Sequence, residues 1–283
     1  MNQQPRDFHD PQQRSVAANT ISKKLFQSLT LGVDYDMELS EPNHGTKAIK
    51  QDHLGGSQKN STSSTTNQPL TTEIEKSPST DTPTTGLIDQ IQALNNQIQQ
   101  CQLCGLCLTR TNSVPGMGSF EPLVMIIGEG PGAEEDRQGL PFVGKAGQYL
   151  DEWLRALGLS RQETVYITNI VKCRPPANRD PHPEEIKSCS LYLEKQIELL
   201  KPRAILSLGR VSAGFLLGGA HRMEDIHGKM FEYRGVPVFP TYHPAAVLRN
   251  QDLRRPVWED LKHMHQFLYV QGLVSELPQR KKE

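Results

Sequence analysis

Five cysteines are the side chains in this 283-residue sequence best suited to chemistry. Three stand in CQLCGLC (residues 101–107), and Cys173 and Cys189 follow in VKCRPP and IKSCS. The two-residue gap between Cys101 and Cys104 lets both sulfurs reach one metal site. The N-terminus has no apolar core and no cleavage site, so we expect a cytoplasmic location, where disulfides are rare. Spacing alone leaves zinc and a metal cluster open.

A glycine-rich turn, GEGPGA (residues 128–133), is the second candidate for chemistry. It fits the dinucleotide-binding pattern G-x-G-x-x-A, but Pro131 lacks the N–H group that would hold pyrophosphate. The next apolar run ends at Asn169 and Lys172, with no acidic residue placed for a ribose. The pattern therefore speaks against nicotinamide or flavin binding, and favours a turn whose glycines let the backbone approach a ligand closely.

The composition limits the functional classes. Lys and Arg number 31 and Asp and Glu 32, so any surface that binds nucleic acid must be local. No apolar run approaches the roughly 20 residues of a membrane-spanning helix. Residues 1–85 are polar and predicted to form a disordered tail. Within it, Ile21, Leu25 and Leu29 have helical spacing, which indicates either a transient helix or a segment that docks on a protein partner.

The domain that must position these residues spans residues 86–275. Buried strands are expected within 122–132, 164–173, 203–209 and 236–244, and helices within 87–100, 144–159, 182–202, 210–218 and 254–273. Strands that alternate with helices predict an α/β fold, a three-layer α/β/α sandwich around a four-stranded, mostly parallel sheet. Ligands bind such sheets at the carboxyl ends of the strands, where GEGPG, TNIVKCRPP and TYHPA are expected.

Seven motifs, in order, carry a family resemblance: CQLCGLC, GEGPGAEED, GLPFVGKAG, TNIVKCRPPANRDP, EIKSC, LSLGRVSAGFLLG and TYHPAAVLRN. Over about residues 88–270 the chain resembles the family 4 uracil-DNA glycosylases, iron–sulfur members of the uracil-DNA glycosylase superfamily. The resemblance implies a repair enzyme that flips uracil out of DNA, hydrolyses its N-glycosidic bond and leaves an abasic site.

The resemblance also implies a four-iron four-sulfur cluster. Carried over by position, its ligands are Cys101, Cys104, Cys173 and Cys189. Cys107 falls outside the ligand pattern and is expected to be a buried or half-exposed thiol. Structural zinc is the alternative, because four thiolates also suit a tetrahedral ion. In either case the metal would connect the N-terminal helix and the loop after the second strand to the sheet, and take no part in base chemistry.

For the base pocket, the resemblance implies Phe142 as the stacking surface, Asn169 as the reader of the uracil edge and His243 as the donor to uracil O2. Backbone N–H groups around Glu129 and Gly130 would add donors. Gly130 stands where family 1 enzymes place a water-orienting aspartate. The acidic residues that could orient the water here are Glu129, Glu135 and Asp136. Glu135 is favoured, and Glu129 is expected to shape the pocket.

Two basic clusters predict contacts with DNA phosphates. They comprise Lys172, Arg174 and Arg179 around the cysteine loop, and Arg249, Arg254 and Arg255 after the histidine motif. Val247 and Leu248 between them resemble the wedge that fills the gap left by a flipped base. A monomer that acts on uracil-containing DNA is expected. The rival hypotheses are an iron–sulfur nucleic-acid-binding protein without glycosylase activity, a redox protein, and an enzyme with shifted base specificity.

Overall fold

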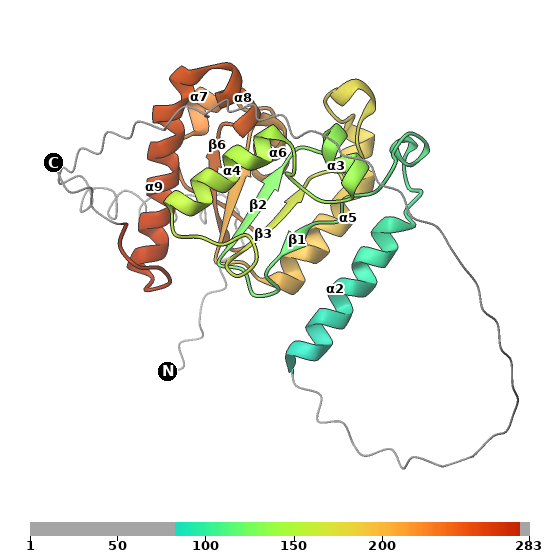
Figure 1. The fold of residues 1–283 in the computed structure, drawn as a ribbon, viewed down its shortest axis with the longest axis horizontal. Helices are drawn as coiled ribbons and strands as arrows, with labels where there is room; N and C mark the ends of the chain where they lie inside the picture. The colour runs from blue at the N-terminus through green and yellow to red at the C-terminus, as the bar shows by residue number, and fades with distance from the viewer. Residues whose placement is uncertain (1–82, 278–283) are drawn as a thin grey trace, which may run out of the picture. The chain divides into compact units, whose positions relative to one another are not determined.

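A six-stranded sheet forms the centre of the computed structural model, which describes residues 83–277 (Figure 1). The strand order is β1-β3-β2-β4-β6-β5. The four inner strands are all parallel, namely β3 (Val165–Asn169), β2 (Val124–Gly128), β4 (Ala204–Leu208) and β6 (Val236–Thr241). Each lies within a predicted strand segment, so the α/β prediction with a parallel core is confirmed.

Two short edge strands bring the sheet from the predicted four strands to six. β1 (Met117–Gly118) pairs antiparallel with β3, and β5 (Phe231–Tyr233) pairs antiparallel with β6. Gly118 permits the first pairing, because a Cβ atom there would lie 2.1 Å from the carbonyl oxygen of Val165. These strands are too short to show a period-two pattern, and they close the two sides of the parallel core.

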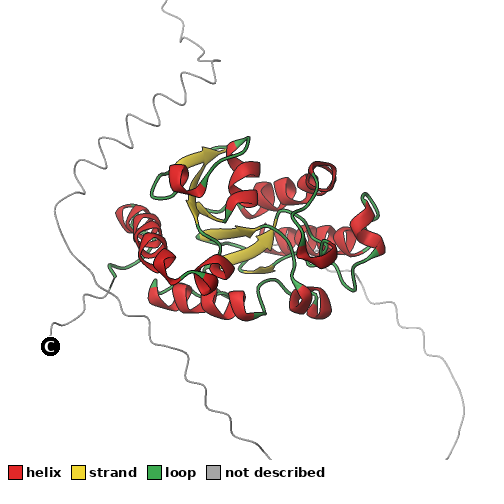
Figure 2. Ribbon diagram, turned by 90° about the horizontal axis from the view of Figure 1, so that it is seen from above, coloured by secondary structure: helices red, strands yellow, loops and turns green. Residues whose placement is uncertain are grey.

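Helices cover both faces of the sheet, as the view from above shows (Figure 2). α2 (Pro83–Gln99) packs beside α5 (Pro183–Leu200). Their apolar faces share one buried cluster with alternate strand residues such as Met125, Ile127 and Ile205. The intervening strand residues point to the other face. There Phe239 of β6 contacts Phe267 and His263 of α9 (Arg254–Val270). The core therefore lies in two layers, one on each side of the sheet.

The other helices of the described residues lie before, between or after the strands. They are α3 (Ala133–Gln138), α4 (Lys145–Ala156), α6 (Arg210–Leu217), α7 (Met223–Ile226) and α8 (Pro244–Arg249), with single 3-10 turns η1 (Gly105–Leu108), η2 (Pro176–Asn178) and η3 (Gln251–Leu253). α3, α7 and α8 were not predicted, because four to six residues show too little of a 3.6-residue period. Helix α2 begins at Pro83, inside the segment predicted to be disordered. The proposed docking segment around residues 21–29 lies outside the described residues.

The search of residues 83–277 for a helix long and apolar enough to cross a membrane found none.

Candidate active site

The carboxyl ends of β2 and β3 carry the candidate site for the base. β2 ends at Gly128 and β3 at Asn169, which are paired in register. A Cβ atom built on Gly128 would lie 2.4 Å from Asn169 Oδ1 and 2.7 Å from Phe142 Cζ. The carboxamide and the aromatic ring therefore meet directly over this glycine. Asn169 and Phe142 are only 1% and 6% exposed, so both groups are fixed by their surroundings.

The Asn169 side chain is buried with an acceptor left open. Its Oδ1 atom is shielded from solvent and has no hydrogen-bond partner among the described residues. An unsatisfied buried acceptor costs about 1–3 kcal/mol, so such groups call for an explanation in a native fold. A ligand that donates a hydrogen bond at this point would supply the missing partner.

His243 brings an imidazole to the same site from the end of β6. Its ring centroid lies 5.6 Å from that of Phe142, with the planes tilted by 30°. The Nδ1 atom accepts a hydrogen bond from the backbone N–H of Ala245 at 3.1 Å, so the ring proton is on Nε2. Burial, reinforced by the charge of Arg249, lowers the pKa of His243 to about 4. The imidazole is therefore a neutral donor at physiological pH.

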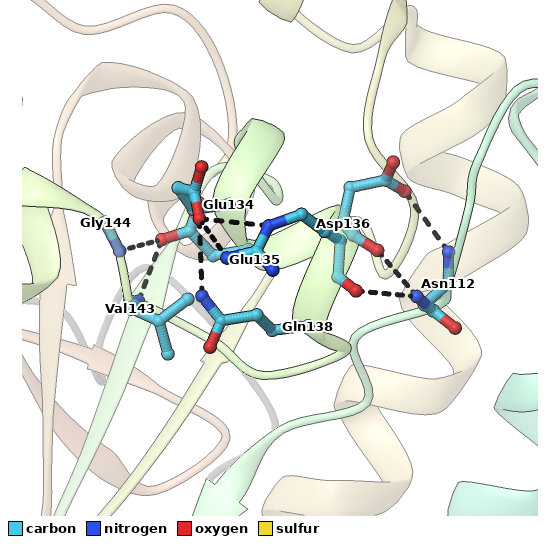
Figure 3. A network of polar contacts seen from close by, with 8 residues as sticks. Asn112, Glu134, Glu135, Asp136, Gln138, Val143 and Gly144 are labelled. Atoms are coloured by element: carbon cyan, nitrogen blue, oxygen red, sulfur yellow. Dashed lines mark hydrogen bonds and ion pairs between the residues drawn. The ribbon is translucent and has the colours of Figure 1, made fainter. Parts of the chain in front are cut away.

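Phe142 occupies its position with a left-handed backbone, φ 54°. This conformation costs about 1–3 kcal/mol for a non-glycine residue and persists only when its surroundings hold it. One such constraint is Glu135, whose Oε1 accepts hydrogen bonds from the backbone N–H groups of Val143 and Gly144, both at 2.8 Å (Figure 3). Glu135 therefore fixes the turn that follows Phe142 and leads into α4.

The three acidic residues considered for water activation have different surroundings. Asp136 is 5% exposed and accepts from the backbone N–H of Thr111 at 2.9 Å and of Asn112 at 3.4 Å. Figure 3 shows its contact with Asn112, on the side of α3 away from Gly144. These bonds give Asp136 a structural role. Glu129 is half-buried, and burial, with the charge of Asp180, raises its pKa to about 6. Glu135 keeps its second oxygen, Oε2, near Gly132.

One cavity is lined by the thiols. Its lining includes all five cysteines, together with apolar and basic neighbours: Cys101, Cys104, Cys107, Cys173, Cys189, Ile98, Leu106, Arg110, Val171 and Tyr192. Arg110 donates to Cys173 Sγ at 2.9 Å, and the backbone N–H of Lys172 points to Cys189 Sγ at 3.3 Å. Burial raises the pKa of Cys173 and Cys189, and these donors oppose the rise because they stabilise thiolates, the form that binds metal. The gathering of five thiols around one cavity fits a bound metal group, and the lining does not separate Cys107 from the other four.

Known proteins with similar sequences identify the family of this chain. The family profile described as "Uracil DNA glycosylase superfamily" matches residues 115–262. The chain belongs to this superfamily. It is 49% identical to a type-4 uracil-DNA glycosylase of Pyrobaculum aerophilum over 60% of this chain and 91% of the relative. For the type-4 enzymes of Saccharolobus solfataricus and Thermotoga maritima, identity is 43% and 41%, over 64% of this chain and 88% and 96% of theirs. The resemblance to family 4 is confirmed.

The prediction that Lys172 contacts a DNA phosphate is wrong. Lys172 is 1% exposed, and its ammonium group donates to Thr168 Oγ1, Asn169 O and Gln196 Oε1 within 2.8 Å. It therefore cannot reach a phosphate. Burial lowers the pKa of Lys172 to about 7, although the thiols of Cys189 and Cys173 oppose the shift. The residue ties the end of β3 to α5.

The other predicted DNA contacts divide by exposure. Arg249 and Arg255 are exposed, Arg174 is half-buried, and Leu248 is 41% exposed. Val247 is 1% exposed and belongs to the core, so the wedge is reduced to Leu248. The other two arginines have local constraints. The guanidinium of Arg179 is held by both oxygens of Glu185 at 2.7 and 2.9 Å, and Arg254 has a shielded Nε atom.

Sequence reasoning missed two groups near this site. Arg210, at the start of α6, forms an ion pair with Asp180, and its charge counters the rise in the pKa of Glu129. Arg161 donates to the backbone carbonyl groups of Pro141 and Phe142. Arg161 stands in none of the seven motifs, and Arg210 stands in LSLGRVSAGFLLG, where no role was assigned to it. Only the folded structure shows these contacts, because Arg161 lies 20 and 19 residues from Pro141 and Phe142, and Arg210 lies 30 residues from Asp180.

Proposed function

We propose that this chain hydrolyses the N-glycosidic bond of uracil in DNA, releases free uracil and leaves an abasic site. One observation carries the proposal: an aromatic ring, an unsatisfied carboxamide oxygen and a neutral imidazole converge at the carboxyl edge of the sheet. Their types match the three needs of the reaction, which are stacking, base selection and stabilisation of a departing anion.

Base selection is assigned to Asn169. Its Oδ1 atom would accept a hydrogen bond from uracil N3–H, and its amide group would donate to uracil O4. Cytosine presents an acceptor at N3 and a donor at N4, so it would leave both groups of a buried carboxamide mismatched. Sites that hydrogen-bond a substrate reject the mismatched analogue strongly. The open acceptor of Asn169 supports this role.

Leaving-group stabilisation is assigned to His243. Because Nδ1 accepts from the backbone of Ala245, the Nε2–H group is the one available to uracil O2. Negative charge develops at O2 as the bond to the sugar breaks, so this hydrogen bond strengthens in the transition state. A neutral donor suits the task, since no proton has to be released before the next cycle. Backbone N–H groups near Glu129 and Gly130 would add to it.

Water positioning is assigned to Glu135. One oxygen is committed to two backbone amides, which leaves Oε2 to accept a hydrogen bond from the attacking water. Glu129 is the alternative, and its raised pKa would give activity an acidic limit near pH 6. Substituting each by glutamine separates the two, because glutamine keeps an acceptor and loses the charge.

The cysteine cavity is assigned to a four-iron four-sulfur cluster bound by Cys101, Cys104, Cys173 and Cys189. Among residues 83–277, the search for three or more His, Cys, Asp or Glu side chains placed to hold a metal ion found none. Four thiolates suit either an iron–sulfur cluster or one tetrahedral zinc ion, and the membership of family 4 favours the cluster. When bound, the cluster would supply a structural cross-link and no step on the base. Brown colour that bleaches on reduction would identify it, and a colourless zinc-loaded protein would contradict it.

DNA contact is assigned to the exposed residues beside the pocket. We infer that Arg174, Arg249 and Arg255 contact phosphates and that Leu248 enters the stack vacated by uracil. Action as a monomer and partner docking by the N-terminal residues remain predictions.

The test is a labelled oligonucleotide that contains one uracil, incubated with purified protein and then heated in alkali. Strand breakage at the uracil, with free uracil in solution, is the expected result. Parallel strands with cytosine, hypoxanthine, or thymine opposite guanine should stay intact. His243→Ala should bind the uracil strand and cleave it orders of magnitude more slowly. A protein that binds the strand and releases no base would be a nucleic-acid-binding protein, and the proposal would fall.

A further inference from the structure

We propose that Arg161 is a positioning residue that holds Phe142 against the base, an inference that rests on the proposed function. Phe142 has a left-handed backbone, yet its ring must stay over Gly128 and beside Asn169. Nothing in the side chain of phenylalanine favours that backbone, so neighbouring groups must fix it.

The guanidinium group of Arg161 holds two consecutive carbonyl groups. Its Nη1 donates to the carbonyl oxygen of Pro141, and its Nη2 to that of Phe142, each at 2.9 Å. A planar fork with donors at fixed angles can hold both carbonyls at once, which a lysine ammonium cannot do with the same geometry. The orientation of the peptide between the two residues is therefore set by Arg161.

The fork is itself anchored. Arg161 donates through Nε and Nη2 to Asp151 Oδ1, at 2.9 and 2.7 Å, and its side chain is only 12% exposed. Asp151 lies on α4, the helix that begins just after Phe142. Gly147 of the same helix packs on Phe142, because a Cβ atom there would overlap the Phe142 carbonyl at 1.8 Å.

Together with Glu135, this arrangement fixes the aromatic turn from two sides. Arg161 holds the carbonyl groups of residues 141 and 142, and Glu135 holds the N–H groups of Val143 and Gly144. A turn whose carbonyls and amides are both bound presents its side chain in one orientation. The hydrogen bonds of Arg161 go to Asp151 and to the carbonyl groups of Pro141 and Phe142, so in this proposal it acts through Phe142.

The experiment is a double-mutant cycle on uracil release, measured in single turnover with the full chain. Arg161→Ala should slow release by about 10- to 100-fold, the scale expected for misplacing a reacting partner by an ångström. In a Phe142→Ala background the same change should have less than about a twofold effect, because its only route of action is already lost. Arg161→Lys should be slowed nearly as much as Arg161→Ala. Multiplicative effects in the cycle would overturn the proposal.

Controls separate positioning from general stability. Arg234→Ala removes another arginine with an ion pair, to Glu194 at 2.8 Å, and should leave release unchanged. If Arg161→Ala folds poorly, Asp151→Asn loosens the same fork and should slow release in the same direction.

A substrate-free readout is the NMR shift of the His243 ring protons, which the Phe142 ring affects across 5.6 Å. This shift should change in Arg161→Ala and stay the same in Arg234→Ala. An unchanged shift in Arg161→Ala would refute the positioning role of Arg161, even if the wild-type protein released no uracil.

Discussion

The substitution Gly128→Ala tests the pocket most directly. The added methyl group would lie 2.4 Å from Asn169 Oδ1 and 2.7 Å from Phe142 Cζ, whereas ordinary contacts begin at 3.4 Å. Asn169 Oδ1 must therefore retreat by about 1 Å, and a displacement of that size at a reacting centre costs about 100-fold in rate. This factor corresponds to about 2.7 kcal/mol of transition-state stabilisation. Both the stacking ring and the base-reading oxygen would be displaced by one small change.

The assay is the single-turnover rate of uracil release from a single-uracil strand, at a temperature well below the melting midpoint of each variant. Gly86→Ala is the matched control, because a Cβ atom there meets nothing within 4 Å and the residue lies in α2. We expect wild-type rates for Gly86→Ala and a loss of about 100-fold for Gly128→Ala. Thermal melting should show that most Gly128→Ala protein remains folded during the assay.

The reasoning would be refuted if folded Gly128→Ala released uracil within threefold of the wild-type rate. That result would mean that the uracil ring does not lie over this glycine, and that the convergence of Phe142 and Asn169 serves packing alone. The reasoning would also be refuted if Gly128→Ala lost activity only near its melting midpoint and regained it at lower temperature, because unfolding would then explain the loss.

Three further results are expected. Between pH 6.5 and 4 the unfolded state binds more protons at His243 than the folded state does, so the free energy of unfolding should fall as the pH drops through that window. In His243→Gln the free energy of unfolding should depend less on pH over the same window. Glu135→Gln keeps the backbone acceptor, so its melting midpoint should stay near wild type while uracil release slows; full activity would exclude it as the water-positioning group. Arg249→Ala should reduce the salt dependence of DNA binding by about one counterion, whereas Lys172→Met should leave that slope unchanged and lower the melting midpoint.

The sequence predicted the parallel core because its strands are continuous apolar runs that end in glycine or polar residues. All five residues from Val124 to Gly128, and all five from Val165 to Asn169, are buried. Such runs belong to strands covered on both faces, and their carboxyl ends mark the ligand edge. The convergence of Phe142, Asn169 and His243 followed from a family resemblance, since no spacing rule relates residues 27 and 74 positions apart.

The failures have physical causes. Lys172 lies in a basic run, VKCR, that reads as a surface cluster, yet its ammonium group meets three acceptors contributed by β3 and α5. A local charge pattern cannot show that acceptors from two packed elements will enclose one of its members. Val247 was assigned with Leu248 to a wedge, although on a short helix adjacent residues face different directions. Val247 turns into the core and Leu248 outward.

The open acceptor of Asn169 links stability to specificity. A fold optimised for stability alone would satisfy Oδ1, because a buried unpaired acceptor costs about 1–3 kcal/mol. Lys172 instead binds the backbone carbonyl of Asn169, which holds the residue in place without occupying its side chain. Uracil would supply the missing donor on entry, whereas cytosine would bring an acceptor to an acceptor. The stability that the free protein forgoes at this atom is thus regained only with the correct base, so rejection of cytosine should weaken in any variant that gives Oδ1 an internal partner.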